Sequence, residues 1–304
     1  MNCKIGIPRA LYYFHFFPLW ETFLAELGFE PVVSPPTNQD ILQRGLSTCV
    51  ESACLPLKAF VGHATFLVEQ GLDLLFVPQV ISVFRKEYTC PYLLGLPDLV
   101  RSYLPATVRL FSPVLDARRG KGQPTFSYLR FGLQFKPPLQ AFKAWRRAKA
   151  VQDELEKAQQ NTNSLPGGLN ILLLGPRYLT DDAYLNGNLL RKLEELGTGV
   201  ITAAAYPDAI TWPAARFLAK PPYWTSTRRA VGALEQAINR IDGVLSIAPF
   251  GCGAHAMQGV LVGSRISGSK AAHLQIYLDE HTSPVGLVTR LEAFCDLLER
   301  KMSG

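Results

Sequence analysis

The sequence predicts an α/β fold made of two Rossmann- or flavodoxin-like domains, with mostly parallel sheets and a cleft between the domains. The first observation is length, because 304 residues suffice for two domains of ~150 residues each. The second is that short apolar segments alternate with amphipathic helical segments early and late in the chain, which favours parallel sheets covered by helices. The third is a run of turn-forming residues, NTNSLPGG, that separates the two alternating regions.

The first alternating region is expected to hold strands and helices in turn. Glycines mark the expected helix ends at Gly28 and Gly45, and Pro56 stands near a helix start, where its missing N–H costs nothing. The expected strands are Cys3–Ile7, Glu30–Ser34, Leu74–Val77 and Val108–Phe111. The expected helices are about Phe16–Leu27, Asn38–Arg44, Pro56–Gln70 and Pro97–Leu104.

The pattern changes between residues 112 and 168, where a loop over Arg118–Lys121 and a long charged helix over Leu139–Gln159 are expected. The alternation then resumes, with expected strands at Asn170–Leu174, Val200–Ala204, Gly243–Ala248 and Gln275–Leu278. The accompanying helices are expected at Ala183–Leu196, Thr227–Asn239, from Ala254 onward, and at Pro284–Lys301. We therefore predict an N-terminal α/β domain over residues 1–160, with a helical, basic extension at about 113–160. A C-terminal α/β domain follows over residues 161–304.

The composition excludes several classes of protein. With 48% apolar and 18% charged residues, the chain is neither disordered nor a coiled coil. The most apolar stretch, Leu72–Phe84, is interrupted by Asp73, Pro78 and Gln79 and is too short to cross a bilayer. The first residues show no basic segment followed by an apolar one, so we expect no signal peptide and a soluble, cytoplasmic protein. A net charge of +6 without a nucleic-acid-binding motif argues against nucleic acid as a partner.

Cysteines carry the chemical signal of this sequence. In an intracellular chain, six cysteines point to metal binding or catalysis rather than to a disulfide framework. They are Cys3, Cys49, Cys54, Cys90, Cys252 and Cys295. Their wide spacing resembles neither a zinc ribbon nor a compact ferredoxin motif.

Three of these cysteines fall where parallel sheets bind ligands. Cys252 follows an expected strand directly and begins a helix, with Gly251 and Gly253 allowing close approach of backbone N–H groups. Cys90 lies in the loop after an earlier strand, and Cys54 stands at a helix start, where the helix dipole favours a thiolate. Convergent thiolates select zinc or an iron–sulfur cluster. On spacing alone, a metal cluster and three unrelated buried cysteines both remain open.

A set of short motifs, in a fixed order along nearly the whole chain, resembles one family. The motifs are IGIPRA at Ile5, SPPTN at Ser34, ACLPLK at Ala53 with Gly62–His63, YTCPY at Tyr88, FGCG at Phe250, DEHT at Asp279 and TRLEAF at Thr289. Together they resemble the activase-related proteins of the 2-hydroxyacyl-CoA dehydratase and benzoyl-CoA reductase superfamily.

The resemblance implies an oxygen-sensitive protein of anaerobic metabolism with a [4Fe-4S] cluster held between α/β domains. Matched residue by residue, it implies Cys54, Cys90 and Cys252 as ligands, with Gly251 and Gly253 beside them. Cys49 is a further candidate, as fourth ligand or as part of a double-cubane [8Fe-9S] cluster. The family's usual Cys-Gly-Pro-Asp motif reads Cys252-Gly-Ala-His255 here, which makes His255 a candidate proton donor and puts a direct transfer of the relatives' chemistry in doubt.

The resemblance further implies a separate ATPase activator with its own cluster, because the chain contains no Walker A phosphate loop. The implied function is that of a low-potential redox component, dehydratase- or reductase-like, which acts on a small substrate or an acyl-CoA. The alternatives are a non-catalytic electron carrier or cluster-storage protein and, less favoured, a zinc-binding module. Pairing with a second copy or a second subunit is also implied.

Other residues have a structural interpretation beside the functional one. The basic residues Arg118, Arg119, Lys121, Lys143, Arg146, Arg147 and Lys149 could dock the partner or a CoA phosphate, or form a solvated face. His63 is expected either near the cluster or as a satisfied core histidine, and Lys58 either offsets cluster charge or extends to solvent. Arg9 and Asn38 are expected to line the cleft or to cap local turns, and Asp279, Glu280 and Arg290 to form a polar network. Cys3 and Cys295 are expected to be buried packing residues.

Overall fold

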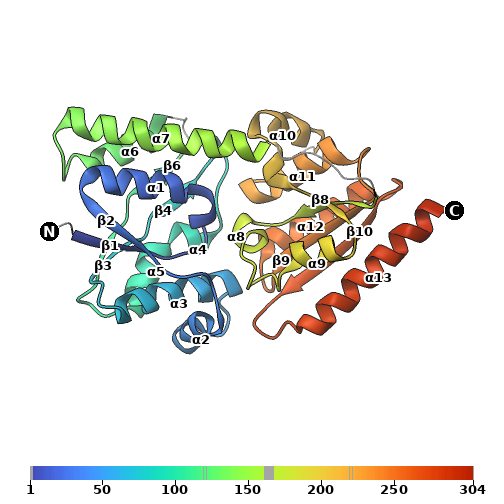
Figure 1. Cartoon of the computed structure of the whole chain (residues 1–304). Coiled ribbons are helices and arrows are strands. Elements are labelled where there is room, and N and C mark those ends of the chain that lie inside the picture. The colour runs from blue at the N-terminus through green and yellow to red at the C-terminus, as the bar shows by residue number, and fades with distance from the viewer. Residues whose placement is uncertain are drawn as a thin grey trace. The chain divides into compact units, whose positions relative to one another are not determined.

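The structure is a computed structural model that describes residues 3–118, 120, 122–160, 168–218, 220 and 222–303. The chain forms two compact units (Figure 1). The first comprises Met1–Lys157 with Tyr223–Thr225, and the second comprises Ala158–Pro222 with Ser226–Gly304. The short return segment belongs to the first unit because Tyr88 N–H donates to the Tyr223 carbonyl at 2.8 Å.

The first unit is built on a four-stranded parallel sheet with the strand order β2-β1-β3-β5. Its strands are β1 (Cys3–Ile7), β2 (Phe29–Val33), β3 (Leu74–Phe76) and β5 (Arg109–Phe111). The helices of this unit are α1 (Tyr13–Leu27), α2 (Gln39–Thr48), α3 (Leu55–Glu69), α4 (Pro91–Leu94), α5 (Leu96–Tyr103), α6 (Gly122–Gly132) and α7 (Pro138–Gln160). A separate two-stranded parallel sheet pairs β4 (Gln79–Ser82) with β6 (Val114–Asp116).

An aromatic core holds α1, α6 and α7 against one face of this sheet, as Figure 1 shows for α1 and α7. Phe23 of α1 makes edge-to-face contacts with Tyr128 of α6 and Trp145 of α7. The Trp20 indole N–H donates to the Tyr128 hydroxyl at 2.9 Å, which satisfies both polar groups in the core. The aromatic residues at the start of α1 pack in or against this core: Tyr12, Tyr13, Phe14, Phe16 and Phe17.

The second unit repeats the same arrangement. Its four-stranded parallel sheet has the order β8-β7-β9-β10, formed by β7 (Asn170–Leu174), β8 (Gly199–Thr202), β9 (Gly243–Pro249) and β10 (Ala272–Leu278). Its helices are α8 (Arg177–Thr180), α9 (Leu189–Glu195), α10 (Asp208–Ala214), α11 (Thr225–Ala237), α12 (Gly253–Ile266) and α13 (Pro284–Ser303), with 3-10 turns at Ala203–Ala205 and Ala215–Phe217. In chain order, both sheets run 2-1-3-4, which confirms the flavodoxin-like fold expected from the sequence.

Gly45 does not end a helix as expected, because α2 continues through it to Thr48. The reason is the close crossing of α2 and α3: a Cβ on Gly45 would lie 1.8 Å from the Lys58 carbonyl oxygen. A Cβ on Gly62 of α3 would lie 2.0 Å from the Ile41 carbonyl oxygen. The glycine at position 45 is therefore a packing residue and carries no helix stop signal.

The helix expected over Ala183–Leu196 is much shorter, since α9 covers only Leu189–Glu195. A side-chain-stabilised turn precedes it, with the Asn186 amide donating to the carbonyls of Leu179 and Thr180 at 2.9 and 2.8 Å. Gly187 and Asn188 then adopt positive φ angles of 64° and 59°. Asn and Gly tolerate this left-handed conformation, which is incompatible with a continuous helix.

The boundary between the units falls at Lys157/Ala158, while the sequence placed it at 160/161. Most of the linker from which that boundary was argued, residues 161–167, lies outside the described residues. The strands β4 and β6 and the helices α4, α8 and α10 were not expected, because they are short or lack a clear apolar period. Helix α6 lies within the helical extension expected at about 113–160, although its bounds were not predicted.

Candidate functional site

Three cysteines occupy the same local position in three different helices. Cys54, Cys90 and Cys252 are the N-cap residues of α3, α4 and α12, each with an extended backbone. None of the three side chains makes a capping hydrogen bond. Since the N-terminal end of a helix carries partial positive charge, this position stabilises a thiolate relative to the same cysteine elsewhere in the chain.

The first-turn amides of α3 and α4 are served by the backbone carbonyl of the cysteine. The N–H groups of Leu57 and Lys58 donate to the Cys54 carbonyl at 3.0 and 3.1 Å. In the same way, the N–H groups of Leu93 and Leu94 donate to the Cys90 carbonyl at 3.0 and 3.1 Å. A proline follows each cysteine within the first turn, Pro56 in α3 and Pro91 in α4, and removes one further orphan donor. These helix starts therefore need no help from the sulfur atoms.

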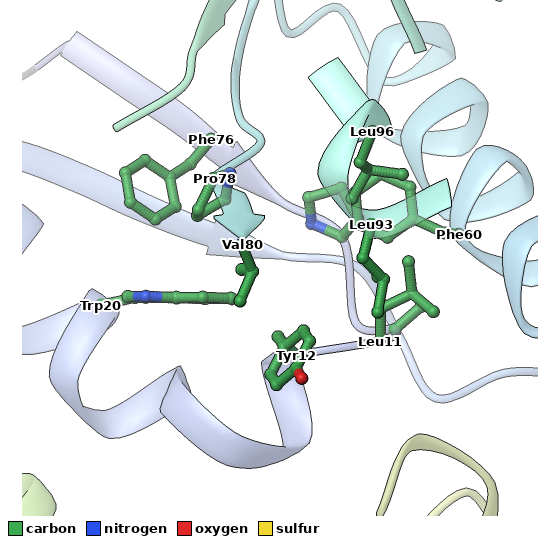
Figure 2. A pocket seen from close by; sticks show the side chains of 11 residues that line it. Leu11, Tyr12, Trp20, Phe60, Phe76, Pro78, Val80, Leu93 and Leu96 are labelled. Carbon is green, nitrogen blue, oxygen red and sulfur yellow. The ribbon is translucent and has the colours of Figure 1, made fainter. Parts of the chain in front are cut away.

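The helices that begin at Cys54 and Cys90 both contribute side chains to one small apolar cavity of the first unit. Figure 2 shows Phe60 of α3 beside Leu93 of α4, with Leu11 and Tyr12 from the loop after β1. The cavity has a volume of about 10 Å³, which is at the lower limit for one water molecule. This gap is therefore a packing feature and is far too small for an organic substrate.

Cys252 lies in the second unit, at the switch point between β7 and β9 where ligands bind in parallel sheets. Gly251 has a φ of 73°, and no atom would lie within 4 Å of a Cβ added at Gly251 or Gly253. Open space thus flanks the cysteine on both sides, and a bulky group can approach its backbone and sulfur.

His255 is the direct neighbour of the Cys252 sulfur. Its Nδ1 lies 3.0 Å from Cys252 Sγ, one turn into α12. Burial raises the pKa of the Cys252 thiol, and the nearby backbone N–H groups of His255 and Ala254 oppose that rise. His255 is itself buried, which lowers the pKa of its imidazole to about 4 and keeps the ring neutral at pH 7.

Cys49 differs from these three cysteines because it caps the C-terminal end of α2. Burial raises the pKa of its thiol to about 11, although the nearby Lys58 ammonium opposes the shift. The negative end of a helix disfavours a thiolate. Cys49 is therefore a protonated thiol at neutral pH in this structure.

The remaining two cysteines have contrasting environments. Cys295 is buried on α13, in agreement with the expected packing role. Cys3 is exposed at the start of β1, so the expectation that it is buried was wrong. Its strand is solvent-accessible at its first two residues and becomes fully buried only from Ile5 onward.

His63 is a fully buried residue of α3 whose two ring nitrogens both have partners. Nδ1 lies 2.9 Å from Ser34 Oγ, and Nε2 lies 3.0 Å from Thr37 Oγ1. Because the Arg9 N–H donates to Ser34 Oγ at 2.9 Å, the serine hydrogen is available for Nδ1. Burial, assisted by the positive charge of Arg9, lowers the pKa of His63 to about 3. The residue is a neutral core histidine that fixes the loop after β2.

The other sequence candidates have local structural roles. Asn38 caps α2, its Oδ1 accepting from the Ile41 N–H at 3.0 Å. Lys58 is buried, so it does not extend to solvent. Asp279 organises the turn after β10, where its Oδ1 accepts from the Thr282 hydroxyl at 2.8 Å and from the His281 N–H at 3.0 Å.

The basic stretch is partly neutralised. Arg118 pairs with Asp116, Arg147 with Glu26 and Lys149 with Asp153. Lys143 and Arg146 form no ion pair with any described residue and are exposed on α7. Arg119 and Lys121 lie outside the described residues.

Sequence reasoning missed a buried charged group in the second unit. Arg228 of α11, only 1% exposed, donates to Asp208 Oδ1 and to Thr211 Oγ1, each at 2.8 Å. Arg229 donates to both oxygens of the same carboxylate. No short motif joins residues twenty positions apart on two helices. The available signal in the sequence was the pair of adjacent arginines, Arg228 and Arg229, directly before the apolar residues of the same helix.

Within residues 3–118, 120, 122–160, 168–218, 220 and 222–303, no three His, Cys, Asp or Glu side chains group as a metal-binding set. Cys54 and Cys90 belong to the first unit, and Cys252 belongs to the second. In the same part of the chain, no helix has the length and apolar character needed to span a bilayer.

Comparison with known proteins places the chain in a family. A search of curated proteins finds no match. A solved structure described as "Crystal structure of ZnuA" matches with 11% identity and a TM-score of 0.31, covering 97% of this chain and 99% of that one, a similarity too low to support an argument. The family model described as "CoA enzyme activase uncharacterised domain (DUF2229)" matches residues 4–205. Since this match covers most of the chain, the protein belongs to the CoA enzyme activase domain family.

Proposed function

We propose that this protein is an iron–sulfur redox component that takes electrons from a separate ATPase activator and delivers them to a small substrate or an acyl-CoA. The observation that carries the proposal is the common position of Cys54, Cys90 and Cys252 at helix N-termini. Membership of the CoA enzyme activase domain family supports the connection to a dehydratase and activase system.

The donor set fits an iron–sulfur cluster in its chemistry. Thiolates are the ligands of such clusters, and three cysteines stand where the positive end of a helix stabilises a thiolate. All three are partly exposed, as ligands that must admit a cluster need to be. The open space beside Gly251 and Gly253 would admit a bulky inorganic group next to Cys252.

Each residue has a definable task in this proposal. The sulfur atoms of Cys54, Cys90 and Cys252 would hold iron, while the Cys49 thiol, with its pKa of about 11, is the least suited of the candidates. His255 would contact the sulfur of Cys252 through Nδ1 and fix its orientation. When bound, a [4Fe-4S] cluster supplies one-electron transfer at a potential tuned by burial and by hydrogen bonds to sulfur.

An exposed basic face offers a docking surface for the ATPase activator. Lys143 and Arg146 point away from the buried side of α7, on which Ala141, Ala144 and Ala148 pack. Because they have no ion-pair partner among the described residues, a partner with acidic side chains can pair with them directly. A solvated face is the simpler alternative, and a charge reversal at both positions separates the two by its effect on electron delivery.

The deciding experiment is the iron and acid-labile sulfide content of protein purified without oxygen. We expect about four of each per chain, and a loss of iron in Cys54→Ser, Cys90→Ser and Cys252→Ser. Cys3→Ser is the matched control, since Cys3 is an exposed cysteine outside any helix start. About eight irons per chain, with loss in Cys49→Ser, would instead indicate a double-cubane cluster. Zinc in place of iron, or no metal in anaerobic protein, would refute the proposal.

A non-catalytic electron carrier or storage protein is the second candidate function. It requires only the three cysteines at helix starts, Cys54, Cys90 and Cys252, and no substrate pocket. A reductase predicts that the reduced protein is oxidised when an acyl-CoA is added. A carrier predicts the same spectrum before and after the addition, with oxidation only by a protein or dye acceptor.

A further inference from the structure

The layer between α12 and the second sheet contains several polar side chains: His255, Gln258, Gln275, Ser246 and His273. Gln275 pairs in register with Ser246 and His273 with Val244, so these residues share one face of the sheet. That face packs against α12, because Val244 belongs to the same core as Val262. A Cβ on Gly259 of α12 would lie 2.5 Å from Gln275 Oε1, which places the Gln275 amide directly against the helix.

Several of these polar groups have no hydrogen-bond partner in the part of the chain that the structure describes. His255 Nε2, both amide atoms of Gln258 and both amide atoms of Gln275 are buried without a hydrogen bond to any described residue. His255 is 2% exposed and Gln258 is 1% exposed. Leaving a buried polar group unsatisfied is costly, so native proteins satisfy nearly all of them with protein or with ordered water.

The unpartnered groups are neighbours along one helix face. Gln258 lies three residues after His255, a spacing that brings two helical side chains together, and Gln275 meets the helix one residue further on, at Gly259. The row continues through Ser246 Oγ to His273 Nε2, 2.9 Å apart, and His273 is partly exposed. At its other end, His255 Nδ1 lies 3.0 Å from Cys252 Sγ. The polar row therefore runs from the edge of the unit to the candidate cysteine.

We propose that the layer beneath α12 is an internal water site, in which ordered water bridges the amides of Gln258 and Gln275 to Nε2 of His255. The occupant is small and neutral, because the row supplies amide, hydroxyl and imidazole groups and includes no carboxylate, lysine or arginine. A water molecule can donate and accept at once, which matches an amide and an imidazole together. Gln258 and Gln275 are then positioning residues that hold the His255 ring with Nδ1 against the Cys252 sulfur. This inference does not depend on the proposed iron–sulfur function.

The direct test uses the unaltered protein. A high-resolution crystal structure is expected to show water within about 3.2 Å of His255 Nε2 and of the Gln258 amide. In solution, protein labelled with ¹⁵N-histidine is expected to show magnetisation transfer between water and the His255 ring, identified by its loss in His255→Gln. A dry layer, in which the two amides bond to each other or to the ring without water, would overturn the proposal.

Substitution separates the two cases further. In a hydrated site, Gln258→Leu removes a water ligand and leaves Nε2 of His255 unpaired, so Tm falls by about 2–4 °C and the His255 ring signals shift. In a dry site where the two amides bond to each other, the same change leaves the His255 ring signals in place, and that result would overturn the proposal. Gln275→Leu is expected to behave as Gln258→Leu does. Met257→Leu is the matched control on the same helix, and it should change neither quantity.

Discussion

The two units of this protein share a sheet topology and a helix crossing, and they differ in the polar and cysteine side chains that these elements carry. Both sheets run 2-1-3-4, and in both a helix pair precedes the third strand. In each pair the second helix has a buried cation as its fourth residue, Lys58 or Arg228, and a glycine as its eighth, Gly62 or Gly232. A Cβ on either glycine would fall within about 2 Å of a backbone oxygen on the other helix. The common frame is thus a close helix crossing.

The two units differ in the positions of their cysteines. Cys90 and Cys252 each cap the first helix after the third strand of their sheets, so they occupy equivalent places. Cys54 has no such counterpart, because the residue before α11 is Trp224. The residue three positions before the crossing point also differs between the units. In the second unit it is Asp208, which pairs with Arg228, and in the first unit it is Asn38, which caps α2. The shared fold therefore fixes which positions lie at the helix starts and at the crossing, while the side chains at those positions differ between the two units.

The largest effect is expected from breaking the shared crossing. Gly62→Ala would force a methyl group to 2.0 Å from the Ile41 carbonyl oxygen, and Gly232→Ala to 2.1 Å from that of Thr211. Because backbone atoms cannot step aside, each change is expected to cost about 3 kcal/mol or more of unfolding free energy, measured by urea denaturation. Gly95→Ala is the control, since its nearest atom lies at 3.7 Å. Equal, small effects at all three positions would show that the crossing is looser than described.

The next effect concerns the buried ion pair of the second unit, between Arg228 and Asp208. Asp208→Asn leaves Arg228 buried opposite a neutral amide, and a loss of about 2–3 kcal/mol at pH 7 is expected. Burial would raise the pKa of Asp208, but Arg229 and Arg228 hold it well below its usual value. A depressed carboxyl pKa gives stability that is present above about pH 4 and is lost as the pH falls further. Thermal melts from pH 7 to pH 3 should therefore converge for the two proteins, and parallel curves would contradict this role.

His63 sharpens the comparison because the equivalent position of α11 is Ala233. The folded state lowers the pKa of His63 to about 3, so above about pH 6.5 the ring is neutral in the folded and the unfolded state alike, and the stabilisation is complete. Between pH 6.5 and pH 5 the first unit should lose about 2 kcal/mol as the unfolded state gains a proton. His63→Ala is expected to be less stable at pH 7.5 and flatter across this pH range. The measurement is urea denaturation at each pH, and an unchanged slope would rule His63 out as its source.

The smallest effect is expected at the cap of α2. Asn38→Ala removes the hydrogen bond from the Ile41 N–H and should cost about 1 kcal/mol. Asn38→Asp keeps an acceptor at this position and should restore the stability. In the second unit, Pro207 precedes α10 without a side-chain cap, so Pro207→Ala should leave that helix unaffected at its cap. Chemical denaturation of the three variants checks both expectations.

Long regular elements were predictable, and short or tertiary ones were not. Strand β1 and strand β7 have the predicted bounds because their apolar runs are flanked by clear turn residues. Gly45 was misread because a glycine that ends a helix and a glycine that lets two helices touch look the same in one sequence. Strands β4 and β6 were missed because three or four residues give no periodic signal.

The site divides in the same way. Cys54 and Cys252 were predicted at helix starts, and both are N-caps. Cys90 was predicted in a loop, and the structure makes it the N-cap of the short helix α4. The partners of His63 lie 29 and 26 residues away in the chain, and those of Arg228 lie on α10, 20 and 17 residues away. Whether the three cysteines share one cluster stays a prediction, because spacing in the sequence carries no information on their convergence.

The turn before α9 also affects the chemical stability of the chain, because it contains an asparagine that can deamidate. An asparagine followed by glycine, as at Asn186-Gly187, deamidates readily when its side-chain carbonyl is free to meet the next backbone nitrogen. Here the Asn186 amide is locked by the carbonyls of Leu179 and Thr180, while its Oδ1 accepts from the Leu189 N–H at 3.1 Å. The folded chain therefore shields this step, and each unfolding event exposes it to irreversible damage. The fraction of deamidated Asn186 would record, in any stored sample, how much time its molecules have spent unfolded.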